Sequence, residues 1–160
     1  MTPGAPRTFP ALQVRSLDGR LLQLPADLPG ELNLIILAFE RRQQDDVDSW
    51  LAGLAGLAEE HPQIELLELP CISRRWTAAR WFIDGGMAAA IKAPEALART
   101  LTAYTDVDAV LLALGHPGRD AICPLLTDRS GTVFWQGAGP YQPALARTLR
   151  ETLRGVPRRS

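Results

Sequence analysis

The sequence predicts an α/β domain in which a mixed sheet of about five strands is flanked by helices. Three patterns support this fold class. A buried-strand pattern, a helical periodicity and a second strand pattern follow one another between residues 32 and 69. A hairpin pattern precedes them, and a strand–turn–strand–helix pattern ends the chain. No internal repeat or low-complexity linker interrupts this order, so we expect one domain over residues 1–160, with a core at about 9–155 and a basic tail at 156–160.

The composition is ordinary for a globular protein and argues against several classes of function. Hydrophobic residues make up 46% and charged residues 22%, with a formal net charge of −1, so no overall field favours nucleic acid or an anionic membrane. No stretch reaches the ~18 apolar residues that cross a bilayer, and the N-terminus has no apolar secretory core. A cytoplasmic location is therefore the expectation. The tail "RGVPRRS" is expected to be a frayed, solubilising end.

A β-hairpin is predicted near the N-terminus. Leu12 and Val14 alternate with polar residues before "LDGR" at 17–20, where Asp-Gly is a strong turn signal. Apolar residues resume at Leu21 and continue to Leu24. Pro25, which cannot continue a ladder of hydrogen bonds, ends the second strand.

A βαβ unit is predicted next. Residues 32–39 are almost uniformly apolar, which is typical of a strand buried on both faces. Asp45 or Asp46 can cap the helix that follows. Its core-facing residues recur at helical spacing, namely Val47, Trp50, Leu51, Leu54 and Ala58. Residues 64–69 supply the second strand, parallel to the first.

The middle of the chain predicts a helical insertion. Ser73 can cap a first helix, and Pro94 can open a second that reaches Leu101. Asp106 can cap a third helix, which ends at Gly115.

A ββα unit is predicted to close the chain. Residues 123–127 and 132–136 have strand patterns around a turn at 128–131. A last helix is expected to open at Pro143 and to end at Gly155. Its apolar face consists of Leu145, Leu149 and Leu153.

Three stretches resemble the thioredoxin-like fold in its redoxin form. "FPALQVRSLDGRLLQLP" resembles the N-terminal hairpin, "ELNLIILAFE" the main strand, and "ICPLLTDRSGTVFWQGAG" the hairpin that a cis-proline begins. The resemblance implies that Pro124 is this cis-proline. Within the superfamily, "ERRQQDDVDSW" and "AYTDVDAVLLALGH" are most similar to the thioredoxin-like assembly factors of mitochondrial ATP synthase and their bacterial relatives. Those factors work beside a membrane in an organelle, and this sequence has no signal for that setting.

Redoxin chemistry requires a thiolate at the start of the helix, where backbone N–H groups and the helix dipole lower its pKa. In this chain the corresponding elbow, residues 40–46, contains no cysteine, and residues 40–50 also lack the peroxidatic pattern. Disulfide exchange or peroxide reduction by the usual route is therefore not expected.

Two cysteines lie elsewhere. Cys71 closes the second strand of the βαβ unit and Cys123 precedes Pro124, so they should flank the central strand at roughly 10 Å from each other. A disulfide requires Cα atoms within about 7 Å, so a direct bridge is not expected. Both cysteines are predicted to be packing residues; the alternative is that Cys123 is an accessible thiol. Because the two Cys and two His do not cluster, no metal site is predicted.

Two surfaces are candidate binding sites. The elbow places arginines at a helix start, where a carboxylate or a phosphate could bind; the alternative is a solvated loop whose acids already occupy the helix N–H groups. Its candidate residues are Glu40, Arg41, Arg42, Gln43 and Gln44, with Cys123 and Pro124 beside them. In the insertion, Trp76 and Trp81 could form an exposed aromatic surface suited to a protein interface, with core packing as the alternative. His116, in "GHPGRD", is expected to be a turn residue.

These features predict a non-catalytic thioredoxin-like protein that binds another protein or itself, as an assembly or chaperone-like factor. The alternative is an enzyme, either an atypical redoxin centred on Cys123 or a binder of a small anionic thiol such as glutathione in the cis-proline groove. No cofactor, nucleic-acid partner or membrane span is predicted, and a small anionic ligand is an open alternative.

Overall fold

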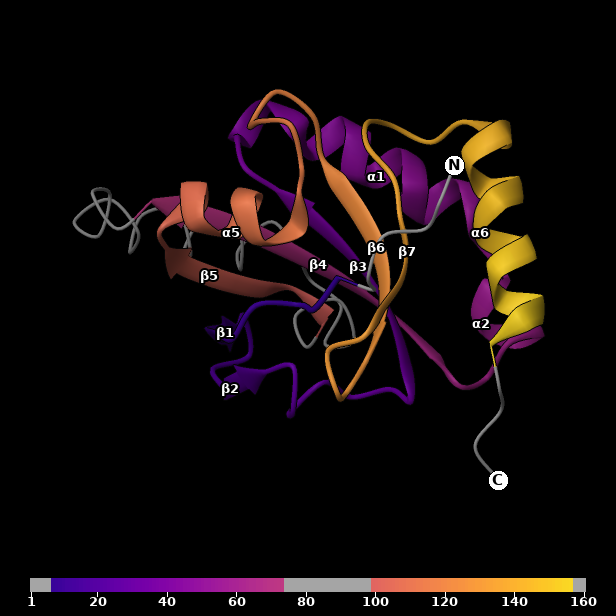
Figure 1. The fold of residues 1–160 in the computed structure, drawn as a ribbon, viewed down its shortest axis with the longest axis horizontal. Coiled ribbons are helices and arrows are strands. Elements are labelled where there is room, and N and C mark those ends of the chain that lie inside the picture. Colours follow the sequence, from indigo (N-terminus) through magenta and orange to yellow (C-terminus); the bar gives the residue numbers. More distant parts are fainter. Residues whose placement is uncertain (1–6, 74–98, 157–160) are drawn as a thin grey trace.

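Figure 1 shows the computed structural model of the protein, which describes residues 7–73 and 99–156. Seven strands form one sheet in the order β2-β1-β5-β4-β3-β6-β7. They are β1 (Leu12–Ser16), β2 (Leu21–Leu24), β3 (Leu32–Ala38), β4 (Ile64–Ser73), β5 (Leu101–Thr105), β6 (Cys123–Asp128) and β7 (Val133–Gln136). The strands β3, β4 and β5 are parallel, and the outer strands pair antiparallel. The predicted mixed sheet is confirmed, with seven strands instead of about five.

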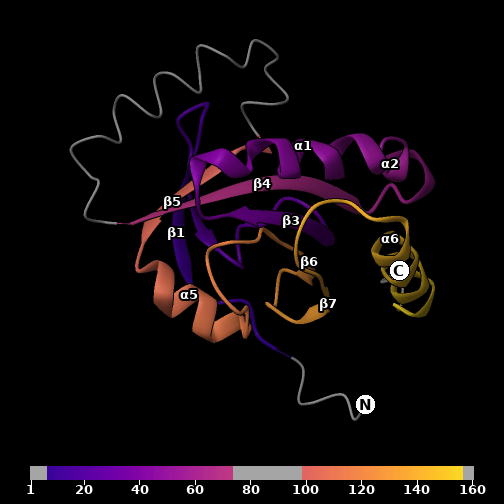
Figure 2. The same cartoon turned by 90° about the horizontal axis from the view of Figure 1, so that it is seen from above.

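Helices cover both faces of this sheet. They are the 3₁₀ turn η1 (Arg41–Gln43), α1 (Gln44–Gly53), α2 (Leu57–Glu60), α5 (Val107–Leu114) and α6 (Pro143–Gly155). Seen from above in Figure 2, α1 runs along one face and α5 lies against the other. Each face has its own apolar cluster. Trp50 of α1 packs with Leu149 of α6, whereas α5 covers a cluster that includes Phe9, Cys71 and Cys123.

Both predicted hairpins and the βαβ unit are confirmed. Strands β1 and β2 pair antiparallel around a turn in which Gly19 has a φ of 96°, a conformation that favours glycine. Strands β3 and β4 are parallel on either side of α1, and β6 and β7 form the last hairpin before α6. The cap of α5 is also as predicted, because the Asp106 side chain accepts a hydrogen bond from the Ala109 amide at the start of the helix.

Three predictions about helices are wrong. Leu101 begins strand β5, not the end of a helix, because the segment "LTAYT" pairs with β1 and β4 through β-favouring residues. Helix α1 ends at Gly53, and Gly56 then adopts a φ of 92°. The chain therefore changes direction, so that Leu57 is buried and Ala58 is exposed. Asp45 and Asp46 lie inside the first turn of α1 and do not cap it.

The helices predicted after Ser73 and after Pro94, with Trp76 and Trp81, fall outside the described residues.

Candidate functional site

The elbow is built around Gln43, whose side chain is 1% exposed. Its Oε1 accepts hydrogen bonds from the backbone amides of Phe39, at 2.9 Å, and Glu40, at 3.2 Å. Its Nε2 donates to the carbonyl oxygen of Arg119 at 2.6 Å. The side chain thus joins the end of β3 to the loop at residues 115–121. The sequence grouped Gln43 with its exposed neighbours and missed this structural role.

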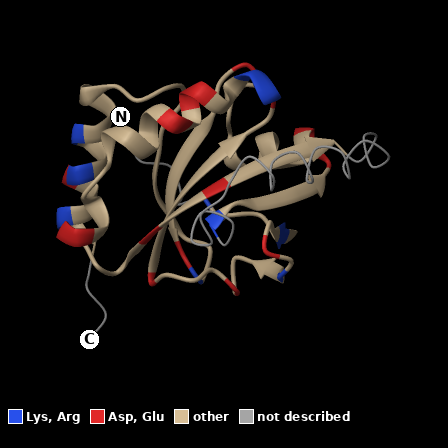
Figure 3. Ribbon diagram, turned by 180° about the vertical axis from the view of Figure 1, so that it is seen from behind, with Lys and Arg blue, Asp and Glu red and all other residues tan. Residues whose placement is uncertain are grey.

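The arginines of the elbow are both exposed. Arg42 pairs with Glu40 and lies 3.6 Å from a carboxylate oxygen of Asp120. Within the described chain, Arg41 makes no ion pair or hydrogen bond. In Figure 3 blue and red segments of the ribbon lie close together at one end of α1, whose first turn contains Asp45 and Asp46. Arg41 is therefore the cation of the elbow that is available to a partner.

Gln44 extends the polar contacts of the elbow onto the sheet. Its Nε2 donates to Asp48 at 2.9 Å and to Glu68 of β4 at 3.2 Å. The second oxygen of Glu68 accepts a hydrogen bond from the Thr100 hydroxyl at 3.4 Å. Burial raises the pKa of Glu68, and the nearby charge of Asp48 raises it further. A half-buried carboxylate consequently lies behind the start of α1.

Cys123 and Pro124 do not form an open groove. Both are buried in β6, opposite Leu37 and Ile36 of β3, and the Pro124 carbonyl accepts a hydrogen bond from Gly137 N at 2.8 Å. The bond between Cys123 and Pro124 is trans, which corrects the expected cis-proline; the cis bond of the described chain precedes Pro25. A regular strand position with partners on both sides accommodates the trans form that X-Pro bonds prefer.

The two cysteines are free and buried, as the sequence predicted. Their strands flank β3 in the sheet. Burial raises the pKa of Cys71 to about 12, with a contribution from the nearby Cys123. Burial also raises the pKa of Cys123 to about 12, although the charge of Arg7 opposes the shift. An accessible thiol at Cys123, the alternative drawn from the sequence, is therefore wrong.

His116 stabilises the loop that covers the elbow. Its side chain is 6% exposed, and its Nε2 lies 2.7 Å from the carbonyl oxygen of Ala121. Its ring lies 5.5 Å from that of Phe39, centroid to centroid. The histidine thus fixes the loop conformation that presents the Arg119 carbonyl to Gln43.

Two kinds of feature were not found within residues 7–73 and 99–156. No three His, Cys, Asp or Glu side chains lie close enough together there to hold a metal ion. No helix in these residues has the length and apolar character needed to cross a membrane.

The chain thus combines a seven-stranded mixed sheet with an elbow that contains no cysteine. No protein-family model and no curated protein sequence matches the chain. Solved structures do match. BsSco, a member of the Sco family of cytochrome c oxidase assembly proteins, aligns with a TM-score of 0.63 and 12% identity over 96% of each chain. Yeast Sco1 with copper bound aligns with a TM-score of 0.62 and 16% identity, again over 96% of each chain.

A third match lies among the thioredoxins. The exposed lipoprotein thioredoxin Etrx1 from Streptococcus pneumoniae aligns with a TM-score of 0.55 and 13% identity over 89% of this chain and 99% of that one. These similarities extend over most of both chains at low identity. They show that the chain has the thioredoxin-like fold.

Proposed function

We propose that this chain is a non-catalytic thioredoxin-like protein that binds a protein partner through its elbow. The observation that carries the proposal is Gln43. A buried neutral amide occupies the start of the helix, where redoxin chemistry requires a thiolate. The amide also takes up the Phe39 and Glu40 N–H groups. The elbow is thus stabilised without a reactive group.

The two thiols do not replace the missing nucleophile. With pKa values of about 12, both thiols stay protonated at neutral pH. Both sulfur atoms also lie in the core, so a substrate disulfide cannot reach them without an opening of the structure. These facts argue against the alternative of an atypical redoxin centred on Cys123.

The exposed side of the elbow favours binding. Arg41 has no partner among the described residues, and Arg42 presents a guanidinium beside it. Arginine on a fixed backbone is common at protein interfaces, because little freedom is lost when it docks on a carboxylate. The proposed role is that of an assembly or chaperone-like factor, similar to the thioredoxin-like assembly factors of ATP synthase. The proposed location is the cytoplasm. An anionic group on the partner is the expected contact.

Two experiments test the proposal. In an insulin-reduction assay with dithiothreitol, the wild-type chain should give no turnover above the rate without protein. A rate that disappears on Cys123→Ser would overturn the non-catalytic assignment.

For binding, the tagged chain is expressed in its own source cells and the co-purifying proteins are identified. The charge-reversal pair Arg41→Glu and Arg42→Glu is compared with Arg147→Glu and Arg154→Glu, which make the same charge change at exposed positions of α6. A partner retained by the α6 variant and lost by the elbow variant is the expected result. Equal retention by both would exclude the elbow as the docking surface.

A further inference from the structure

The segment at residues 7–9, here called the strap, lies beside residues 131–133, at the outer edge of the sheet where β7 begins. The Phe9 amide donates to the carbonyl of Gly131 at 2.7 Å, and the Val133 amide donates to the carbonyl of Arg7 at 2.9 Å. Thr8 forms an antiparallel bridge with Thr132 between these two bonds. Because β7 is the last strand of the sheet, the strap extends the sheet by one short strand.

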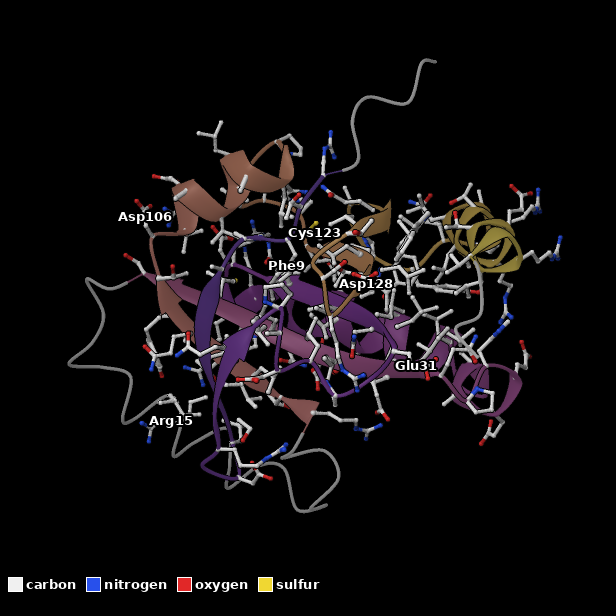
Figure 4. The ribbon with its side chains drawn as sticks, turned by 60° about the horizontal axis from the view of Figure 1, so that its bottom comes forward. Phe9, Arg15, Glu31, Asp106, Cys123 and Asp128 are labelled. Atoms are coloured by element: carbon white, nitrogen blue, oxygen red, sulfur yellow. The ribbon has the colours of Figure 1, made fainter. Side chains whose placement is uncertain are left out.

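Two side chains of the strap pack against defined parts of the fold. Phe9 is 2% exposed and belongs to the same apolar cluster as Cys123, next to which it is labelled in Figure 4. The Arg7 guanidinium lies against Gly115, where a Cβ atom would come within 2.9 Å of Arg7 Nη2. Gly115 ends α5, and the C-terminal end of a helix attracts a cation. The edge therefore has an aromatic position and a cationic position, two residues apart on one side of an extended segment.

The strap also contributes to the surroundings of Cys123. The thiol is fully buried in the same apolar cluster as Phe9, and the charge of Arg7 lowers its pKa against the larger effect of burial. Cys71 is equally buried in the same cluster but belongs to the central strand β4. Displacement of the strap should therefore expose Cys123 while Cys71 stays covered.

We propose that the outer edge of β7 is a peptide-binding site of the strand-addition type, which the strap fills in the free protein. The partner that it fits is an extended protein segment with a cationic side chain two residues before an aromatic ring. Strand addition takes its affinity from backbone hydrogen bonds and its specificity from alternate side-chain positions, and the strap displays both features. This site uses none of the elbow residues, so it is independent of the function proposed above.

Two properties make the strap exchangeable. It is held by two backbone hydrogen bonds, which together form the single bridge, a much shorter ladder than those inside the sheet. Pro10 and Ala11 separate it from β1, and Pro10 has no amide to continue the pairing. A segment held by so few backbone hydrogen bonds opens locally at a small fraction of the global unfolding free energy.

The first experiment uses the wild-type chain and its two cysteines. A thiol reagent is added under native conditions, and mass spectrometry follows the labelling of each cysteine. Cys123 should be labelled at least about tenfold faster than Cys71, because local opening of the strap precedes global unfolding. Equal rates that both follow global unfolding would overturn the proposal.

The second experiment supplies the strap as a separate molecule. A fluorescent peptide with the sequence of residues 7–12, RTFPAL, is titrated into the full-length Phe9→Ala variant and followed by anisotropy. Thr8→Ala, at an exposed position of the same segment, is the matched control, since its own Phe9 still competes at high effective concentration. A peptide with alanine in place of phenylalanine controls for the ring.

The folded Phe9→Ala variant should bind RTFPAL at least about tenfold more tightly than the Thr8→Ala control does. The same variant should bind RTFPAL at least about tenfold more tightly than the peptide that has alanine in place of phenylalanine. Bound peptide should also slow the labelling of Cys123 and leave Cys71 unchanged. Absence of binding, or equal binding of the two peptides, would overturn the proposal. If Phe9→Ala does not fold, the comparison of the two cysteines in the wild-type chain decides.

Discussion

Replacing Gln43 by alanine removes three hydrogen bonds from the base of the elbow. The variant leaves the amides of Phe39 and Glu40 and the carbonyl of Arg119 without the side chain that they contact. An intramolecular hydrogen bond contributes about 0.5–1.5 kcal/mol, and a buried polar group left unpaired costs about 1–3 kcal/mol. Some of these groups can recruit water, so we expect the unfolding free energy to fall by about 2–4 kcal/mol.

The measurement is urea unfolding followed by the fluorescence of the buried residues Trp50 and Trp135. At about 2–4 °C per kcal/mol for a chain of this size, the melting temperature should fall by roughly 4–16 °C. Gln44→Ala is the matched control, because Gln44 is the next residue and bonds to Asp48 and Glu68 with its side chain exposed. That control should lose less than about 1 kcal/mol. A Gln43→Ala variant as stable as the Gln44→Ala variant would refute the structural role of the buried amide.

Three more predictions concern the sheet and its helices. Because burial raises the pKa of Glu68 above its ordinary 4.5, the folded protein retains a proton that the unfolded chain loses. The unfolding free energy therefore falls as the pH rises from 4.5 through the raised pKa. Urea unfolding at about pH 4 and pH 7 measures this fall in unfolding free energy, and Glu68→Gln should remove it. A fall of the same size in the variant would contradict the raised pKa of Glu68. Leu149→Ala, at a fully buried position of α6, should lower the unfolding free energy by about 2–5 kcal/mol. Leu112→Ala, at a position that is 84% exposed, should change it by no more than about 0.5 kcal/mol. Similar losses in both variants would count against the packing of α6. Asp106→Ala should destabilise α5 by about 0.5–2 kcal/mol, and a change within error in thermal melts would show that the cap is dispensable.

The elements that the sequence predicted correctly are those with local signals. The Asp-Gly turn between β1 and β2 and the cap at Asp106 each depend on a few adjacent residues. Strand β3 was evident because a nearly uniform apolar run fits a strand buried on both faces. Strand β5 has a weaker local signal, since its β-favouring residues form only a short segment. Its identity as a strand comes from pairing with β1 on one side and β4 on the other, which the sequence of five residues does not encode by itself.

The sequence indicated the elbow between β3 and α1 but not the contacts of its side chains. That residues 40–46 contain no cysteine can be read directly from the sequence. The burial of Gln43 could not be derived in the same way, because it depends on the carbonyl of Arg119, 76 residues further along the chain. The trans bond before Pro124 was missed for a related reason. A resemblance transfers the family's usual conformation, but it does not show whether this chain retains it.

The contacts of Gln43 also explain how an elbow without a thiol keeps its shape. The amides of Phe39 and Glu40 both donate to Gln43 Oε1, so these donors are satisfied by a neutral oxygen and no negative charge is required to organise them. His116 and the Arg119 carbonyl hold the opposite side of the elbow in place. Arg41 and Arg42 are thereby displayed on a backbone that is already ordered, which would lower the entropy lost in the docking proposed above. The rigidity of this elbow therefore does not depend on a reactive group.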